Sequence, residues 1–146
     1  ALVQILNEHN EYESFCVLYP TAPFRGATDI SATIRLLDPP NCNFAMAVTY
    51  YDLSPHQALI QENSFLIPKW PDLVSKRSSE IGTLLVDNGS TYAAVTESFL
   101  KEQSFYGKSL KGHIMPRNRS VDLDTKEDLF FLEYLAHNIN SENFCD

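Results

Sequence analysis

Two aspartates separated by one residue are the strongest candidates for chemistry in the chain. Asp122 and Asp124 alternate with Val121 and Leu123. An extended strand would therefore place both carboxylates on one face and both apolar side chains on the other. Mg²⁺ is often held by one or two carboxylates together with the oxygens of a substrate phosphate. Two solvated acids beside a helix start would give the same short pattern, so the spacing alone leaves both interpretations open.

The residues after the aspartates predict a helix. Thr125 and Asp128 have the spacing of a capping box. Apolar residues then recur at helical spacing to about residue 140, namely Leu129, Leu132, Leu135 and Ile139. We therefore expect a strand that ends at the aspartates and passes directly into a helix. Such an edge of the sheet is where α/β proteins bind ligands.

The first third of the chain predicts a strand, a helix and a second strand. Residues 1–10 indicate the end of a helix, and residues 15–19 and 44–50 are short apolar runs typical of buried strands. Between them, residues 26–38 predict a helix whose inward side chains are Ile30, Ile34 and Leu37. This order predicts an α/β fold with a mostly parallel sheet and helices on both faces.

Residues 51–77 have a different character. Prolines interrupt the segment, and its apolar residues fall in two short groups at 58–60 and 65–67. We expect a pair of short antiparallel strands within an irregular, protruding excursion. Trp70 would either pack this excursion down or cover a partner surface.

The second half of the chain predicts further strands and a turn. Residues 84–87 are a short apolar stretch, and Asn88-Gly89 is a turn signal. Strands are predicted at 90–95 and 109–115, with a short helix from 96 to about 101.

Composition limits the class of partner. The chain has 146 residues, the size of one domain, and a net charge of -8, which argues against general nucleic-acid binding. Between Lys101 and Lys126, however, basic residues outnumber acids. A basic surface around two metal-binding acids suits a phosphorylated or carboxylated substrate, although a solvated surface gives the same pattern. The three widely spaced cysteines indicate neither a disulfide framework nor a zinc site. We expect a cytoplasmic protein that contacts no membrane.

Three segments together resemble one enzyme family. They are Tyr-Pro-Thr-Ala-Pro-Phe-Arg at 19–25, Asn-Gly-Ser-Thr-Tyr at 88–92 and Met-Pro-Arg-Asn-Arg-Ser-Val-Asp-Leu-Asp-Thr at 115–125. In this order they are similar to motifs of the cytidylyltransferases that activate sialic acid and related nine-carbon sugar acids (nonulosonic acids). The resemblance implies a Rossmann-like nucleotidyltransferase fold. It also implies transfer of CMP from CTP to the anomeric hydroxyl of such a sugar acid, with release of pyrophosphate.

The resemblance also assigns roles to residues. Asp122 and Asp124 match the acids that hold Mg²⁺, and Arg77 matches an arginine that approaches the substrate across a homodimer interface. The excursion at 51–77 corresponds to the part that projects from the sheet and helps to form that interface. The remaining substrate-side positions are Tyr19, Thr21, Arg25, Gln57, Asn88, Gly89, Tyr92, Phe105 and Tyr106.

Two departures from the family pattern bear on the sugar. Tyr19 stands where sialic acid enzymes usually have a glutamine, and Gln57 stands where they usually have a lysine. Both positions lie on the substrate side. They favour a related sugar acid, legionaminic or pseudaminic acid, over N-acetylneuraminate itself.

The chain begins at Ala1 inside a helical pattern and without a methionine or a capping residue. It also lacks the basic nucleotide-binding loop found at the start of the family. We interpret residues 1–146 as a single, incomplete cytidylyltransferase domain, and expect weak CTP binding and no synthesis from this chain alone. The alternatives are a Kdo cytidylyltransferase with the same chemistry, or a non-catalytic fragment that dimerises or binds sugar.

Overall fold

The computed structural model describes residues 1–139, which form two compact units. The first unit consists of Ala1–Thr49 and the chain from Asp87 onward, and the second is Tyr50–Val86. The predicted excursion at 51–77 lies within the second unit. We describe each unit by itself.

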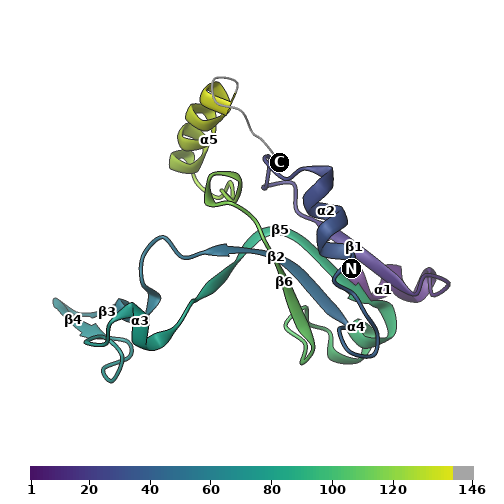
Figure 1. Ribbon diagram of the computed structural model, residues 1–146, viewed down its shortest axis with the longest axis horizontal. Helices are drawn as coiled ribbons and strands as arrows, with labels where there is room; N and C mark the ends of the chain where they lie inside the picture. The colour runs from purple at the N-terminus through teal and green to yellow at the C-terminus, as the bar shows by residue number, and fades with distance from the viewer. Residues whose placement is uncertain (140–146) are drawn as a thin grey trace. The chain divides into compact units, whose positions relative to one another are not determined.

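A four-stranded sheet forms the centre of the first unit (Figure 1). Its order is β1 (Ser14–Leu18), β5 (Leu85–Val95), β2 (Phe44–Tyr50) and β6 (Leu110–Ile114). Strand β1 is antiparallel to β5, and β2 is parallel to β6. The Val95 N–H at the end of β5 donates to the carbonyl of Asn43, just before β2, at 2.9 Å. This contact between the end of one strand and the start of the other makes β5 antiparallel to β2 as well.

The α/β class is confirmed, but the prediction of a mostly parallel sheet is wrong. The sheet is mixed, because β5 runs against both of its neighbours. Parallel neighbours need a crossover connection, which is usually a helix. Strand β5 is instead reached through the second unit, and it enters the sheet between β1 and β2 in the reverse direction.

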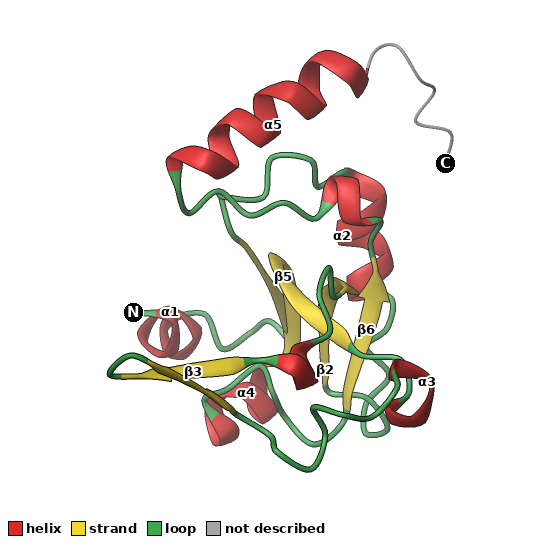
Figure 2. Ribbon diagram, turned by 90° about the vertical axis from the view of Figure 1, so that its left-hand side faces the viewer, coloured by secondary structure: helices red, strands yellow, loops and turns green. Residues whose placement is uncertain are grey.

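Helices cover both faces of this sheet (Figure 2). Leu6 of α1 (Leu2–Glu8) and Phe99 of α4 (Thr96–Glu102) are buried against Phe44 and Ala94 on one face. Helix α2 (Ala27–Ile34) packs against β6 on the other face. The helices therefore bury the two sets of alternating strand side chains.

Helix α2 differs from its predicted form. It ends at Ile34, which is 40% exposed, and the residues buried against the sheet are Asp29 and Thr33. Of the predicted inward residues, Ile30 and Leu37 are half-buried and only Ile34 is exposed. The apolar periodicity missed the fully buried residues, because it cannot show that a polar side chain will find partners in the interior. Thr33 donates its hydroxyl to the carbonyl of Asp29 at 2.9 Å, and Asp29 is bound by four donor groups described below.

Phe105 joins the two apolar clusters of the core. It packs against the cluster around Phe44 and Phe99 and against the cluster formed by Met46, Val48 and Tyr92. Its ring centroid lies 4.8 Å from that of Phe99 and 5.0 Å from that of Tyr92. Aromatic pairs at such separations add to the free energy gained by burial alone.

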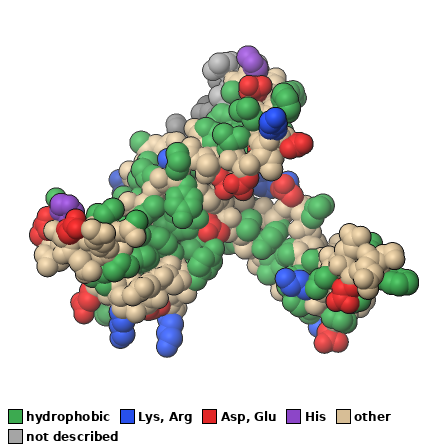
Figure 3. Space-filling view, turned by 180° about the vertical axis from the view of Figure 1, so that it is seen from behind, with side chains coloured by type: hydrophobic (Ala, Val, Ile, Leu, Met, Phe, Trp, Pro, Cys, Tyr) green, Lys and Arg blue, Asp and Glu red, His purple; other side chains and the backbone are tan. Residues whose placement is uncertain are grey.

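The second unit contains a hairpin and two short helical segments. Strands β3 (Leu59–Glu62) and β4 (Phe65–Pro68) pair antiparallel, which confirms the predicted pair of short strands. The helical segments are η1 (Pro55–Gln57) and α3 (Ser78–Ile81). Every residue of β3 is exposed. Figure 3 shows hydrophobic side chains at the surface of this unit, on the right of the view.

The last helix, α5 (Lys126–Ile139), begins as predicted. Thr125 N–H donates to Asp128 Oδ2 at 2.7 Å and Asp128 N–H donates to Thr125 Oγ1 at 3.2 Å, which confirms the capping box. Among residues 1–139, no helix is long and apolar enough to cross a membrane. The polar end of the chain beyond residue 139 lies outside the described residues.

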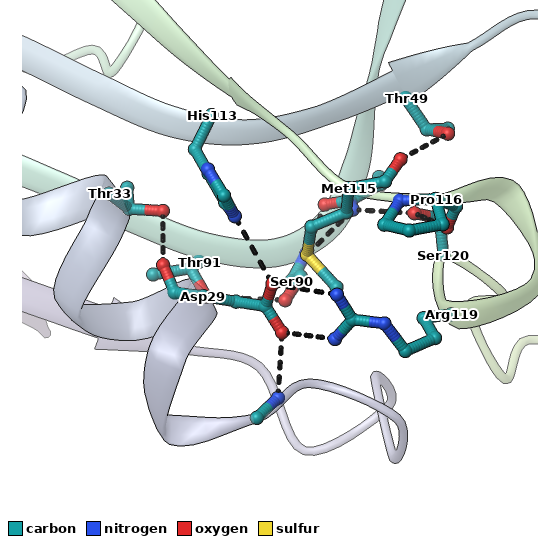
Figure 4. A network of polar contacts seen from close by, with 12 residues as sticks. Asp29, Thr33, Thr49, Ser90, Thr91, His113, Met115, Pro116, Arg119 and Ser120 are labelled. Carbon is teal, nitrogen blue, oxygen red and sulfur yellow. Dashed lines mark hydrogen bonds and ion pairs between the residues drawn. The ribbon is translucent and has the colours of Figure 1, made fainter. Parts of the chain in front are cut away.

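A buried carboxylate ties α2 to the end of the sheet (Figure 4). Asp29 is only 2% exposed. Oδ2 accepts hydrogen bonds from Gly26 N–H at 2.9 Å and Arg119 Nη1 at 2.5 Å. Oδ1 accepts from Arg119 Nη2 at 3.1 Å and His113 Nε2 at 3.1 Å. The contacts join the start of α2, strand β6 and the 3₁₀ segment η2 (Arg117–Arg119).

These donors determine the protonation of Asp29. Burial acts to raise the pKa of this carboxyl group, but the hydrogen bonds from Arg119, Gly26 and His113 and the charge of Arg119 outweigh it. The pKa of Asp29 therefore lies below its usual value. The charged form is the one that the fold stabilises.

Replacement of Phe105 by alanine tests its place in the core. We expect Phe105→Ala to lower the free energy of unfolding by about 3 kcal/mol, because it leaves a cavity among the rings of Phe15, Tyr92 and Phe99. Urea unfolding measures the change. The control Phe130→Ala removes a ring that is 70% exposed and should cost less than about 0.5 kcal/mol. Equal effects of the two substitutions would contradict the assignment.

The lowered pKa of Asp29 predicts acid sensitivity. Below about pH 4 the unfolded chain binds more protons at this group than the folded chain does, so the stabilisation that Asp29 provides is lost as the pH falls through its folded-state pKa. Asp29→Asn should be less stable than wild type at pH 7 and should lose less further stability between pH 5 and pH 3. Denaturant unfolding across this range is the measurement, with the exposed Asp38→Asn as the control. A variant whose loss with pH equals that of wild type would refute the role of Asp29.

Candidate functional site

The carboxylate of Asp122 lies directly against the backbone of Gly89. A Cβ atom built on Gly89 would stand 2.4 Å from Asp122 Oδ2, and the φ angle of this glycine is 66°. Both facts favour glycine at position 89, because another side chain would displace the Asp122 carboxylate and the left-handed backbone favours glycine. The second and third sequence motifs therefore meet at this point.

The Asn88-Gly89 pair does not form the predicted turn. Both residues lie inside β5, which continues without a break from Leu85 to Val95. Asn88 is buried, and its side-chain amide donates to Ser120 Oγ at 3.1 Å and Met115 Sδ at 3.3 Å. The turn signal instead marks a local irregularity in a long strand, which glycine permits without ending the strand.

The segment that carries the two aspartates is not the predicted strand. The segment η2 precedes it, and residues 120–124 form no regular structure before α5. The Leu123 N–H donates to the carbonyl of Thr21 at 2.9 Å, which joins the third motif to the first. The period-of-two pattern was misleading because no neighbouring strand pairs with these residues in the described part of the chain.

The two aspartates have different surroundings. Asp122 is partly buried, and its Oδ1 is fully shielded without a hydrogen-bond partner among the described residues. Asp124 is exposed, and its backbone N–H donates to Asp128 Oδ2 at 3.1 Å. A buried carboxylate oxygen without a donor is costly unless a cation or another donor satisfies it.

The first motif forms the loop on which this segment rests. Arg25 Nη1 donates to the carbonyls of Tyr19 and Ser90, both at 2.8 Å. Arg25 was predicted to bind substrate, and that role stays a prediction. In the structure its Nη1 binds backbone carbonyls and connects the loop after β1 to β5.

Aromatic residues of the predicted pocket wall gather beside Gly89. The ring of Tyr92 lies 5.1 Å from that of Tyr19 and 5.0 Å from that of Phe105. Tyr92 and Tyr106 each donate a hydroxyl hydrogen bond to Asp87 Oδ2 at 2.8 Å. Tyr106 is 67% exposed, whereas Phe105 is partly buried and packs against the core. Tyr19 and Tyr106 are thus exposed rings that are held to β5 through the buried Tyr92 and through Asp87.

Asp87 is the residue of this group that the sequence analysis missed. It also accepts the Gly89 N–H at 3.0 Å. In a regular strand Asp87 and Tyr92 would point to opposite faces, because their positions in the sequence differ by an odd number. The irregular backbone at Gly89 changes the alternation and brings both side chains to one side. The adjacent Asn-Gly signal was the one available hint.

The protonation of this group follows from the same contacts. Burial raises the pKa of Tyr92, and the hydrogen bond to Asp87 and the charge of Asp87 raise it further. Tyr92 therefore stays a neutral donor to the carboxylate. Its hydroxyl is a fixed part of the site and does not act as a base.

Two predicted site residues belong to the second unit. Gln57 lies in η1, and Arg77 is the N-cap residue of α3, where its backbone N–H donates to Glu80 Oε2 at 2.7 Å. The other predicted positions lie in the first unit. The substrate contacts predicted for Gln57 and Arg77 stay predictions.

The donor set around Asp122 fits a hard cation that a ligand helps to hold. Among residues 1–139, no group of three or more histidine, cysteine or acidic residues could hold a metal by itself. Asp122 offers an unpaired buried oxygen, and Asp124 follows at an exposed position. One or two carboxylates completed by water and phosphate oxygens are a usual environment of Mg²⁺ in proteins.

Comparison with curated proteins finds relatives along most of the chain. It is 24% identical over 143 residues to the pseudaminic acid cytidylyltransferase of Campylobacter jejuni subsp. jejuni serotype O:23/36 (strain 81-176), which covers 97% of this chain and 61% of that protein. It is 28% identical over 127 residues to the N-acylneuraminate cytidylyltransferase of Escherichia coli O18:K1:H7 (strain RS218 / NMEC), which covers 84% of this chain and 30% of that protein. The N-acylneuraminate cytidylyltransferase of Streptococcus agalactiae serotype V (strain ATCC BAA-611 / 2603 V/R) is 21% identical over 139 residues, which covers 93% of this chain and 33% of that protein.

The chain thus spans about three fifths of the Campylobacter relative and about a third of the other two. No protein-family profile matches it. The relatives carry the names of the family whose three motifs the sequence resembles. The chain is a distant homologue of the pseudaminic acid and N-acylneuraminate cytidylyltransferases.

Proposed function

We propose that this chain belongs to an enzyme that transfers CMP from CTP to a nonulosonic acid. The anomeric oxygen of the sugar acid forms a bond to the α-phosphorus, and the bond from that phosphorus to the oxygen bridging to the β-phosphate breaks. The products are the CMP-sugar and pyrophosphate, and the hydroxyl proton is released. The observation that carries the proposal is the unpaired, buried Oδ1 of Asp122 beside Gly89, where two of the family motifs meet.

Asp122 and Asp124 would hold Mg²⁺ in this reaction. Bound there together with phosphate oxygens, the ion neutralises charge on the reacting phosphoryl groups. Asp122 is kept in place by its contact with Gly89 and by the Leu123–Thr21 hydrogen bond. Arg77 would bring its charged fork to the carboxylate or phosphate of the substrate.

The exposed rings of Tyr19 and Tyr106 would contact the sugar, and the sugar contact of the buried Tyr92 stays a prediction. Tyr92 and Tyr106 both donate to Asp87 Oδ2, which fixes the positions of their hydroxyl groups. Tyr19 and Gln57 replace a glutamine and a lysine of the sialic acid enzymes. We therefore propose legionaminic or pseudaminic acid as the acceptor, and the Campylobacter relative is named for pseudaminic acid.

We further propose that the second unit pairs with a second copy of the protein. Phe65 is 73% exposed and Leu66 is 63% exposed, and Trp70 follows the hairpin at 39% exposure. A two-stranded hairpin is at best marginally stable in water without a surface to pack on. A second copy would bury these side chains, and a large apolar surface is typical of such interfaces.

Substitution of the aspartates tests the reaction. In the full protein encoded by the gene, Asp122→Asn and Asp124→Asn should each reduce CMP-sugar formation at least tenfold, a loss of about 1.4 kcal/mol or more in barrier stabilisation. Pyrophosphate release from CTP, Mg²⁺ and a panel of nonulosonic acids is the readout. Glu127→Gln removes a nearby exposed acid as the control. The proposal fails if both aspartate variants keep wild-type rates across a Mg²⁺ titration.

Charge introduced into the hairpin tests the dimer. Leu66→Glu should weaken self-association at least tenfold, because a carboxylate would be buried in an apolar interface. Sedimentation at micromolar concentration measures this. The control Leu53→Glu lies in the same unit outside the hairpin, at 84% exposure, and should leave association unchanged. A wild-type protein that sediments as a monomer would rule the dimer out.

A further inference from the structure

The segment that carries Asp122 is held on both sides, by the loop of the first motif after it and by α2 before it. After Asp122, the Leu123 N–H donates to the carbonyl of Thr21 at 2.9 Å. Before it, the Arg119 guanidinium binds Asp29 through Nη1 at 2.5 Å and Nη2 at 3.1 Å. The residues between these contacts have little freedom, so the position of the Asp122 carboxylate depends on both.

Asp29 is a rigid anchor for the second of these contacts. It is 2% exposed, and Gly26 and His113 donate to it from the start of α2 and from β6 (Figure 4). The two hydrogen bonds from Arg119 form a bidentate fork, which fixes the orientation of the guanidinium as well as its distance. A lysine at position 119 would keep the charge and lose the fork.

The turn at 116–120, which contains Arg119, is also bound by β5. Asn88 Nδ2 donates to Ser120 Oγ at 3.1 Å, and that hydroxyl donates to the carbonyl of Pro116 at 2.9 Å. Asn88 directly precedes Gly89, against which Asp122 lies. The turn at 116–120 therefore connects the anchor on α2 with the glycine that receives the carboxylate.

We propose that Asp29 and Arg119 are positioning residues for the cation site at Asp122. Neither residue touches the cation or the substrate. Their fork sets where the unpaired Oδ1 of Asp122 stands. Mg²⁺ requires nearly octahedral geometry, and a displacement of about 1 Å in such a site weakens function strongly. The inference rests on the proposed function, because it takes Asp122 as a cation ligand.

The test measures cation binding directly, with Mn²⁺ as the probe. The full protein is titrated with Mn²⁺ in the presence of CTP at pH 7, and the free ion is followed by electron paramagnetic resonance. We expect Arg119→Lys and Asp29→Asn each to weaken Mn²⁺ affinity at least tenfold. The double variant should lose no more than about the larger single loss, because both changes remove one contact. Arg35→Lys, an exposed arginine at the end of α2, is the matched control and should bind as wild type.

The variants must be compared as folded proteins, so the unfolding midpoint is measured in parallel. A merely structural contact would lower the midpoint and leave the Mn²⁺ affinity of the folded protein unchanged, which would overturn the inference. Asp29→Asn loses a buried charge partner and is the variant more prone to unfold. Arg119→Lys keeps the positive charge, and the wild-type Arg119 side chain is 21% exposed. This variant is therefore the less prone to unfold, and its Mn²⁺ affinity is the deciding measurement.

A reference variant separates the two proposals. If Asp122→Asn loses Mn²⁺ binding while Arg119→Lys keeps it, the positioning role is wrong and the proposed cation site stands. Losses that simply add in the double variant would also overturn the positioning role. If Asp122→Asn binds Mn²⁺ as wild type does, the cation site itself is wrong and the inference falls with it.

Discussion

The contact between the Asp122 carboxylate and the backbone of Gly89 is the constraint on which the rest of the site depends. It requires a left-handed glycine inside a long strand, and it requires the segment after η2 to approach that strand closely. Neither requirement is local. The loop after β1 supplies the carbonyl of Thr21 for Leu123, and Asn88 supplies a donor for Ser120. The position of the Asp122 carboxylate thus depends on three segments that are far apart in the sequence, namely the loop after β1, strand β5 and the segment after η2.

Asp29 and Asp122, both in the first unit, differ in whether their buried carboxylate oxygens have hydrogen-bond donors. Asp29 receives hydrogen bonds from Gly26, Arg119 and His113, and its pKa is held low, so its charge is fully compensated within the chain. Asp122 lacks such compensation at Oδ1 among the described residues. A fold gains nothing from a buried oxygen without a donor. The simplest physical reason for it is a partner from outside the chain, and this contrast distinguishes the candidate site from an ordinary structural ion pair.

The sequence predicted most elements, because those elements depend on local patterns. The apolar run of β2, the capping box at Thr125 and Asp128 and the pair β3–β4 are all encoded within a few neighbouring residues. The errors concern long-range partners. The direction of β5, the inward face of α2 and the irregular segment at 120–124 each depend on contacts that no local period reveals. The motifs did identify Asp122 and Gly89. The hydrogen bonds of Asp87 to Tyr92 and Gly89 could not be predicted, because they form only where the backbone at Gly89 departs from the regular strand alternation.

The two units differ in how far each can stabilise itself. The first unit buries Phe44, Ala94 and Phe99 between a sheet and two helices, so its core is complete enough to fix the loops of the site. In the second unit, all of β3 and most of β4 are exposed, although these strands carry Leu59, Ile60, Phe65 and Leu66. Apolar side chains on a two-stranded hairpin gain little free energy unless another surface covers them. Ile67 is a fifth exposed apolar residue of these strands, and such a surface fits the proposed pairing with a second copy better than it fits a free loop.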